Sequence, residues 1–325
     1  MRAVLMKARD DVPRISEMRG TSSRFRCRVI VLLAWLGDLF LGEPPARFHP
    51  VVWIGNYLRA ARGYNDRTVA RGAALWLGGA AMVLGVSYGA QSFARRLSFP
   101  FNMIAFAVLL KPLFAWRALK NAAQQVVNAP DLPSARKELS WHLVSRDTSE
   151  LSAGEVYGAT IESVAENLSD SLIAPILFFL AGGLPLVALY RYANTADAMW
   201  GYRTADLERF GKFAARVDDA LNFFPSRLTA LLLIANARAA NLDARRAWRV
   251  WRRDARLTSS PNAGQPMSAM AGALGRRLSK RAVYTLGAEF SKPTRRDVMR
   301  ALRVANFAAW TFVTVAVMIA LWKRK

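Results

Sequence analysis

The sequence predicts an all-α, polytopic membrane protein with broken or re-entrant helices and a large polar helical insert. The chain of 325 residues combines 53% hydrophobic residues with a formal net charge of +23, an unusual balance for a soluble domain. Its apolar residues gather in blocks whose length approaches the roughly 20 residues that cross a bilayer core. No segment shows a convincing alternation of apolar and polar residues, so we expect almost no β structure.

Five apolar segments are candidate membrane spans. They are residues 29–41, 72–93, 101–119, 172–190 and 305–322. The first is either a short span or a buried helix, and Lys111 and Pro112 interrupt the third. Gly182, Gly183 and Pro185 interrupt the fourth, so we expect a broken helix or hairpin that returns both of its ends to one side.

The domain organisation follows from these segments. We interpret residues 1–24, which are polar and lack apolar periodicity, as a disordered extension. Residues 25–325 are predicted to form a single membrane-embedded catalytic domain, with a polar motif region at about 140–290. Residues 220–235 carry Asn, Pro and Arg in their first half, which favours a broken or re-entrant helix.

The basic excess indicates where the protein acts. Basic segments at both ends predict cytoplasmic termini, an even number of spans and a multi-pass protein of the cell inner membrane. Arg238–Arg256 holds seven arginines with Trp248 and Trp251 between them, a pattern typical of an amphipathic helix in contact with anionic membrane lipid. We expect no nucleic acid partner. Cys27 is the single cysteine, which excludes an intrachain disulfide and a CxxC metal site.

Residues 162–171 (ESVAENLSDS) carry the first chemical signal. Glu162, Glu166 and Asp170 recur every four residues, which places them on one face of a helix. Such carboxylates repel one another unless Mg²⁺, arginines or water intervene. A solvated surface is the ordinary explanation, but these acids run directly into an uncharged segment of a chain that is poor in acids, which favours a functional role.

Three further polar segments carry candidate residues: 191–203, 214–227 and 260–264. Their candidates are Arg191, Asn194, Asp197 and Tyr202 in the first, Asp218, Asp219, Asn222 and Arg227 in the second, and Ser260, Asn262 and Gly264 in the third. The second segment is equally well explained as a salt-bridge network. The third (SPNAG) is a tight turn whose backbone N–H groups are suited to a phosphate, although a five-residue turn alone is weak support.

The two histidines lie far apart in the sequence. His49 and His142 therefore do not predict a zinc site. His49 belongs to a proline-rich turn, where a structural hydrogen bond is the expected role.

Six sequence blocks, in order, resemble the adenosylcobinamide-phosphate synthase family, known as CbiB or CobD in cobalamin pathways. They are LGDLFLGEPPARFHPVVWIG (36–55), VSRDTSEL (144–151), IESVAENLSDSLIAPILFFLAGG (161–183), YRYANTADAMWGYR (190–203), FGKFAARVDDALNFFPSRLTA (210–230) and SPNAGQPMSAMAGALG (260–275). The chain departs from the family pattern at Glu43, where Asp is usual, and at Ser171, where Gly is usual.

This resemblance implies ATP-dependent amide formation. The substrates would be adenosylcobyric acid and (R)-1-aminopropan-2-ol or its O-phosphate, with Mg²⁺ and ATP required. The implied catalytic residues are Glu162, Glu166, Asp197 and Asp218, and the implied metal ligands are Glu162, Glu166, Asp170 and Asp219. The implied substrate or phosphate contacts are Arg146, Asn167, Arg191, Asn194, Tyr202, Asn222, Arg227, Ser260, Asn262 and Gly264. A homo-oligomer is compatible with this assignment.

Two other functions fit the residues without the resemblance. A Mg²⁺-dependent intramembrane prenyl or phosphoalcohol transferase would also place spaced acids at helix ends near the bilayer. A transporter would show similar broken helices and intramembrane charges. ATP hydrolysis that depends on substrate would indicate the ligase. Release of diphosphate would indicate the transferase, and uptake of a substrate without turnover would indicate the transporter.

Overall fold

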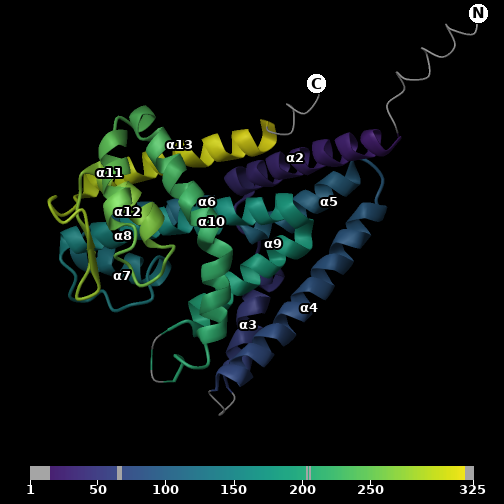
Figure 1. Cartoon of the computed structure of the whole chain (residues 1–325), viewed down its shortest axis with the longest axis horizontal. Coiled ribbons are helices and arrows are strands. Elements are labelled where there is room, and N and C mark those ends of the chain that lie inside the picture. Colours follow the sequence, from purple (N-terminus) through teal and green to yellow (C-terminus); the bar gives the residue numbers. More distant parts are fainter. Residues whose placement is uncertain (1–14, 64–67, 203, 205, 319–325) are drawn as a thin grey trace, which may run out of the picture.

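The computed structural model describes residues 15–63, 68–202, 204 and 206–318, and it is almost entirely helical (Figure 1). In chain order the elements are α2 (Ile15–Leu41), α3 (Pro50–Arg62), α4 (Val69–Arg96), α5 (Phe101–Leu110), α6 (Trp116–Asn128), α7 (Leu132–His142), α8 (Ala153–Leu168), α9 (Ala174–Trp200), α10 (Lys212–Asn236), α11 (Ala244–Asp254), α12 (Gly264–Leu274), β1 (Leu278–Lys280), β2 (Tyr284–Leu286) and α13 (Arg295–Met318).

Four helical segments within the described residues are long and apolar enough to cross a membrane. They are Val69–Arg96, Phe101–Asn128, Ala153–Trp200 and Arg295–Met318. The prediction of an all-α, polytopic membrane protein is thus confirmed. A short 3₁₀ turn, Lys111–Leu113, separates α5 from α6 at the interruption that the sequence indicated. The segment 29–41, predicted as either a short span or a buried helix, is part of α2, which is not among the four.

The segment from α8 to α9 folds back on itself, as the two glycines predicted. Gly182 and Gly183 have non-helical backbone angles, and Gly183 lies at φ 71° and ψ −156°, a region that side chains exclude. The exposed backbone is satisfied from α4, because Leu184 N donates to Gln91 Oε1 at 3.0 Å. The rings of Phe178 and Tyr190, one on each arm, stack with their centroids 4.8 Å apart. We call residues 153–200 the helical hairpin.

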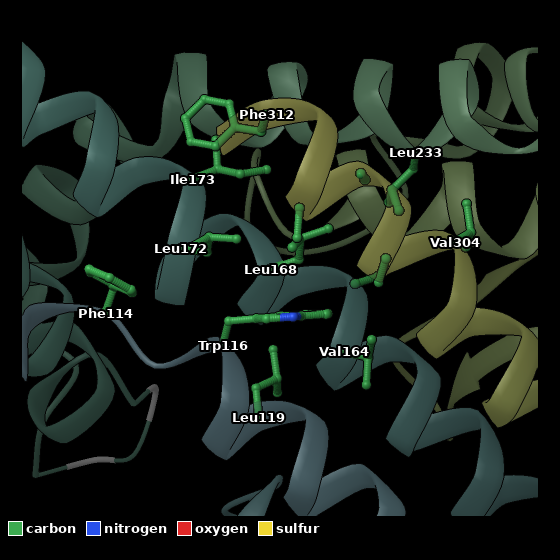
Figure 2. Packing of buried hydrophobic residues seen from close by; sticks show 14 of the residues in the cluster. Phe114, Trp116, Leu119, Val164, Leu168, Leu172, Ile173, Leu233, Val304 and Phe312 are labelled. Carbon is green, nitrogen blue, oxygen red and sulfur yellow. The ribbon is translucent and has the colours of Figure 1, made fainter. Parts of the chain in front are cut away.

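The main apolar core joins the helical hairpin to α2, α6, α10 and α13. In Figure 2 the fully buried Trp116 ring of α6 lies among Leu119, Val164 and Leu168. α2 and α13 meet where Trp35 and Trp310 pack edge to face, with ring centroids 5.4 Å apart. Close packing of such large side chains stabilises the contacts between these helices.

A partly buried charge network ties α2 to the break after α5. Lys111 Nζ lies 3.1 Å from Asp38 Oδ1 and 2.7 Å from Glu43 Oε1. His49 Nε2 lies 3.1 Å from Glu43 Oε2, and His49 Nδ1 accepts a hydrogen bond from Val51 N at the start of α3. The predicted structural role of His49 is confirmed. The carboxylate at position 43, which departs from the family pattern, contacts both Lys111 and His49.

Three expectations differ from the structure. The predicted break within 220–235 is wrong, because α10 continues through Pro225. Pro225 has no N–H group to donate to the helix, and packing of α10 against α9 and α12 offsets the missing hydrogen bond. α2 begins at Ile15, inside the predicted extension, whereas residues 1–14 lie outside the described part of the chain. A two-stranded antiparallel hairpin, Leu278–Lys280 with Tyr284–Leu286, escaped prediction because three residues are too few for a recognisable alternation.

The arginine-rich segment forms the predicted amphipathic helix, α11. Its apolar face, with Ala247 and Val250, packs against α12 in the protein. Arg246 binds the end of α12 by donating to the carbonyl oxygens of Gly272 and Ala273 at 2.7 and 3.0 Å. Other arginines of α11 remain exposed, so contact between this outer face and lipid stays a prediction.

Candidate functional site: an acidic cavity at the open end of the helical hairpin

A polar cavity of about 640 Å³ lies where the two ends of the helical hairpin meet α10. Because the hairpin reverses at Gly182 and Gly183, the polar segments before and after the apolar span reach the same place. The predicted site residues that line this cavity are Glu166, Asn167, Asp170, Asn194, Asp197, Tyr202, Asp218, Asn222, Ser260 and Asn262. The structure therefore unites residues from all four polar segments.

Four carboxylates dominate the cavity wall. Glu166 and Asp170 come from the first arm of the hairpin, Asp197 from the second and Asp218 from α10. None of the four makes an ion pair with a basic side chain of the described residues. A cavity lined by four carboxyl groups that form no direct ion pair is suited to a ligand that carries positive charge or brings a metal ion.

Two asparagines connect these carboxylates. Asn194 Nδ2 lies 3.2 Å from Asp170 Oδ2 and 3.4 Å from Asp218 Oδ1, so one amide donates to both acids. Asn222 Nδ2 donates to Asp218 Oδ2 at 3.0 Å. The orientation of this second amide is fixed by Tyr190, whose buried hydroxyl donates to Asn222 Oδ1 at 2.8 Å. The asparagines thus hold the Asp170 and Asp218 carboxyl groups close together.

Asp170 belongs to a π-helical turn, Ser169–Ile173, between α8 and α9. Such turns insert an extra residue, which shifts the direction of the following side chains, and they occur frequently at functional sites. Here Arg191 donates to the Asp170 carbonyl oxygen at 3.2 Å. The buried Ser169 hydroxyl lines the cavity without a hydrogen-bond partner among the described residues.

Asp218 is 8% exposed, and its environment alters its proton affinity. Burial, the largest cause, raises the pKa of Asp218 to about 6, and the neighbouring Asp219 adds to this rise. Hydrogen bonds from Asn222 and Asn194 act in the opposite direction. Binding of a cation would favour the ionised form of this carboxyl group.

A smaller pocket of about 210 Å³ adjoins the cavity. We call it the side pocket; it is lined by Leu143, Val144, Ser145, Arg146, Ala159, Glu162, Ser163, Glu166, Lys280 and Tyr284. Glu166 lines both spaces, as does the segment 143–145. Burial and then the charge of Glu162 raise the pKa of Tyr284 well above its usual range, which keeps its hydroxyl protonated.

The SPNAG turn is held to α10 by side chains. Ser260 Oγ donates to Asp219 Oδ1 at 3.1 Å, and Asn262 Nδ2 donates to the Asp219 carbonyl oxygen at 2.8 Å. Arg227 Nη1 donates to Asn262 Oδ1 at 3.1 Å. Gly264 is needed for packing, because a Cβ there would collide with the Ala255 carbonyl oxygen. Asp219, Arg227 and Gly264 thus support the cavity wall from outside.

The four predicted metal ligands do not assemble as one set. Glu162 faces the side pocket, Asp219 contacts the SPNAG turn, and only Glu166 and Asp170 line the cavity. Among the described residues no three His, Cys, Asp or Glu side chains are arranged to hold a metal ion. Each step of four residues turns about 40° around a helix, so Glu162 faces the side pocket, Asp170 faces the cavity and Glu166 lines both.

Sequence reasoning missed several polar residues that line these spaces. Ser145, Lys280 and Tyr284 line the side pocket, and Ser169 lines the cavity. Tyr202 reaches across from the end of α9 and donates to Ser145 Oγ at 2.7 Å. Ser169 lies in the ESVAENLSDS segment and could have been predicted from it. Nothing in the sequence places Lys280 and Tyr284 next to α8.

The fold and site define a helical membrane protein whose hairpin encloses an acidic polar cavity. The chain matches the CobD/Cbib protein family over residues 31–311 and belongs to this family. It is 37% identical over 289 residues to the probable cobalamin biosynthesis protein CobD of Methanothermobacter thermautotrophicus, covering 88% of this chain and 96% of that relative. It is 40% identical over 288 residues to the cobalamin biosynthesis protein CobD of Geobacter metallireducens, covering 86% and 89%.

A third relative, the cobalamin biosynthesis protein CobD of Citrobacter koseri, is 37% identical over 286 residues, which cover 85% of this chain and 89% of that protein. No solved structure matches the chain. Family membership places the chain in cobalamin biosynthesis, with a corrinoid-type substrate.

Proposed function

We propose that this protein joins the free propionate of adenosylcobyric acid to the amine of (R)-1-aminopropan-2-ol or its O-phosphate, at the expense of ATP. Family membership supports the pathway. One observation supports the specific reaction. Four carboxyl groups line one cavity and form no ion pair with a basic side chain among the described residues: Glu166, Asp170, Asp197 and Asp218. A ligase that handles nucleotide phosphates needs such oxygen donors for a divalent cation.

The chemistry proceeds in two balanced steps. The propionate oxygen attacks the γ-phosphorus of ATP, so that an acyl phosphate forms and ADP leaves. The amine nitrogen then attacks the acyl carbon, the new C–N bond replaces the C–O bond, and inorganic phosphate leaves with the electron pair. We assign the proton released by the amine to Glu166, because this carboxylate lines both the cavity and the side pocket.

Mg²⁺ is the metal that this chemistry calls for, and the donor set fits it. Asp170 and Asp218 share the Asn194 amide as a hydrogen-bond donor, so their oxygen atoms lie close together. Mg²⁺ in nucleotide enzymes is usually held by one or two carboxylates together with phosphate oxygens and water, so two protein ligands suffice. When bound, the ion would offset the negative charge of the phosphates. Asn194 and Asn222 would keep both carboxylates in place.

The location proposed for the protein is the cell inner membrane, with the four apolar segments embedded in the bilayer. The exposed arginines of α11, which include Arg245, Arg249 and Arg252, are proposed to contact anionic lipid headgroups. A homo-oligomer stays a prediction.

The test is amide formation by the purified protein in detergent. Adenosylcobyric acid, Mg-ATP and either amine are supplied, and product and ADP are followed by mass spectrometry. We expect product with the wild type and a loss of at least about 100-fold with Glu166→Gln, since a positioned acid or base contributes that much. Glu150→Gln, at an exposed carboxylate outside both pockets, is the matched control. Folded wild-type protein that forms no amide with either amine would refute the proposal.

A further inference from the structure

An apolar groove of about 790 Å³ lies between α3, α4, the break after α5 and the second arm of the helical hairpin. One wall is α4 between positions 82 and 90, and the opposite wall is the proline-rich turn 44–48 with the start of α3. Figure 1 shows α4 at the edge of the molecule, with α9 on its inner side. The floor of the groove consists of Leu184, Ala188 and Tyr192 of α9, which are all buried. None of the described residues that line this groove lines the acidic cavity or the side pocket, so the proposed reaction leaves it without a role.

The apolar groove is continuous with the apolar surface of two membrane segments. α4 and α5 belong to two of the four segments that are long and apolar enough to cross a membrane. Val86 of α4 and Val108 of α5 line the groove, and they are 66% and 65% exposed. Phe93 and Ile104, on the same two helices but outside the groove, are exposed as well. In a bilayer, the hydrocarbon of lipid chains contacts such a surface and has direct access to the groove.

Polar side chains of the groove are hydrogen-bonded within the protein. The hydroxyl groups of Tyr57, Tyr192 and Ser87 donate to backbone carbonyl oxygens of α4 at 2.7, 3.0 and 2.6 Å. Trp53 Nε1 donates to the Arg47 carbonyl oxygen at 2.9 Å. Because these donors are engaged, a ligand in the groove meets hydrocarbon instead of free hydrogen-bond donors.

The charged side chains at the end of the groove are paired with one another. Lys111 and Glu43 line the groove beside the break after α5, and Lys111 Nζ lies 2.7 Å from Glu43 Oε1. Lys111 Nζ also lies 3.1 Å from Asp38 Oδ1, so one cation already faces two carboxylates. A fatty acid carboxylate or a phosphate in this place would add a negative charge without a new cation. The groove is therefore suited to the uncharged chain of a lipid and not to its headgroup.

We propose that the apolar groove binds one acyl chain of a membrane phospholipid, with the headgroup outside the groove. Its volume of about 790 Å³ falls within the roughly 300–1,000 Å³ of ordinary ligand pockets, and its lining matches a hydrocarbon chain. The chain contacts Leu184, whose N–H donates to Gln91 Oε1 beside the bend of the hairpin. Its packing thus stabilises the arm that carries Asn194 and Asp197 into the acidic cavity. Binding of the chain does not depend on the proposed amide formation.

Photolabelling tests the position of the chain directly. The full-length protein is reconstituted into phosphatidylcholine vesicles that contain a small proportion of phosphatidylcholine with a diazirine on one acyl chain. After irradiation, mass spectrometry of peptides identifies the labelled residues. Lipid that only surrounds the protein labels exposed residues such as Leu77 and Phe93 and does not reach the buried Ala188 and Tyr192. We expect label on Ala188 and Tyr192, and label confined to exposed residues overturns the proposal.

Ala90→Phe places an aromatic ring in the groove. Ala90 lines the groove from α4 and is partly exposed. We expect labelling of Ala188 and Tyr192 to fall about 10-fold or more, because the ring occupies volume that the chain needs. Ala81→Phe is the matched control, because position 81 is about two and a half helical turns away and therefore lies on the opposite, exposed face of α4. Labelling in the control should stay within about 2-fold of the wild type, and equal losses in both variants overturn the proposal.

Thermal unfolding supplies a second measurement that needs no variant. Extensive washing with detergent removes bound phospholipid, and phosphorus analysis checks its removal. The unfolding temperature of the wild type should fall on removal and recover when phosphatidylcholine is added back, because a ligand that binds the folded state stabilises it. An unfolding temperature that does not respond to lipid removal overturns the proposal. A dimer that dissociates in Ala90→Phe, with Ala188 and Tyr192 unlabelled in the wild type, assigns the groove to a second copy of the chain and also overturns it.

Discussion

Asn194 donates a hydrogen bond to Asp170 at 3.2 Å, although 24 residues separate them in the chain. In a continuous helix this spacing would place them about 36 Å apart. The reversal at Gly182 and Gly183 brings them together and turns one apolar segment into the support for a polar site. The geometry of the cavity therefore depends on the backbone at the far end of the hairpin as well as on the residues that line it.

The Asn194 amide should be essential for holding the two carboxylates. Asn194→Ala removes the shared donor of Asp170 and Asp218, so the repulsion between them is no longer offset. We expect kcat/KM for amide formation to fall about 10- to 100-fold, as for the loss of hydrogen bonds to charged groups. Thr195→Ala is the control, because Thr195 donates only to the Arg191 carbonyl of its own helix. Equal losses in both variants would contradict the assigned role.

Gly183→Ala should destabilise the hairpin. A side chain at φ 71° and ψ −156° is strained by about 1–3 kcal/mol, and the new Cβ would also collide with Gln91 Oε1. We expect a lower temperature of unfolding in detergent and loss of activity. Gly85→Ala, on the same α4 helix as Gln91, has no atom within 4 Å of the new Cβ and should be neutral or slightly stabilising. A Gly183→Ala protein as stable as wild type would show that the bend does not need this glycine.

The sequence was sufficient to predict the hairpin and the return of its two polar ends to one side, because both depend on local signals. Gly182, Gly183 and Pro185 mark the bend, and spaced acids flank the apolar segment on both sides. Once the bend is inferred, Asp170 and Asn194 must meet. The supporting contacts of other predicted site residues were not foreseen from the sequence. Gly264 permits close packing with the chain at Ala255, and no motif distinguishes this requirement from phosphate binding.

The side pocket was not predictable because its walls come from segments that share no local pattern. Lys280 and Tyr284 belong to strands of three residues, and Ser145 lies in a connection between helices. Their proximity to Glu162 results from packing of β1 against α8. Tertiary contacts of this kind are set by the complete fold, so a single sequence indicates the residue types but not the partners.

Asp254 should stabilise the protein at neutral pH. Burial favours the protonated acid, but hydrogen bonds from Arg253 and from Gly287 N, the latter at 2.7 Å, outweigh it and hold the pKa of Asp254 below its usual range. Because the folded-state pKa is lower than the unfolded value, the ionised group stabilises the fold above about pH 4, and this stabilisation is lost as the pH falls further. Asp254→Asn should cost about 1–3 kcal/mol at pH 7.

Thermal unfolding between pH 3 and pH 8 checks this expectation. The difference between wild type and Asp254→Asn should be constant from pH 8 to about pH 5 and shrink below about pH 4. Glu289→Gln provides the comparison, because Glu289 pairs with the same Arg253 at 2.8 Å but is exposed, and such pairs contribute less than about 1 kcal/mol. If the stability difference between wild type and Asp254→Asn grew as the pH fell, the ionised form of Asp254 would not be the stabilising one.

Removal of Mg²⁺ should abolish amide formation. Asp170→Asn removes one anionic ligand of the proposed site, so it should raise the Mg²⁺ concentration needed for half-maximal activity by about 10-fold or more. The measurement is the initial rate after chelation, followed by stepwise addition of Mg²⁺ at saturating ATP. Glu150→Gln should follow the wild-type curve, since this acid is exposed and outside both pockets. If Asp170→Asn lowers the maximal rate without moving the Mg²⁺ midpoint, Asp170 positions its neighbours and the ion is held elsewhere.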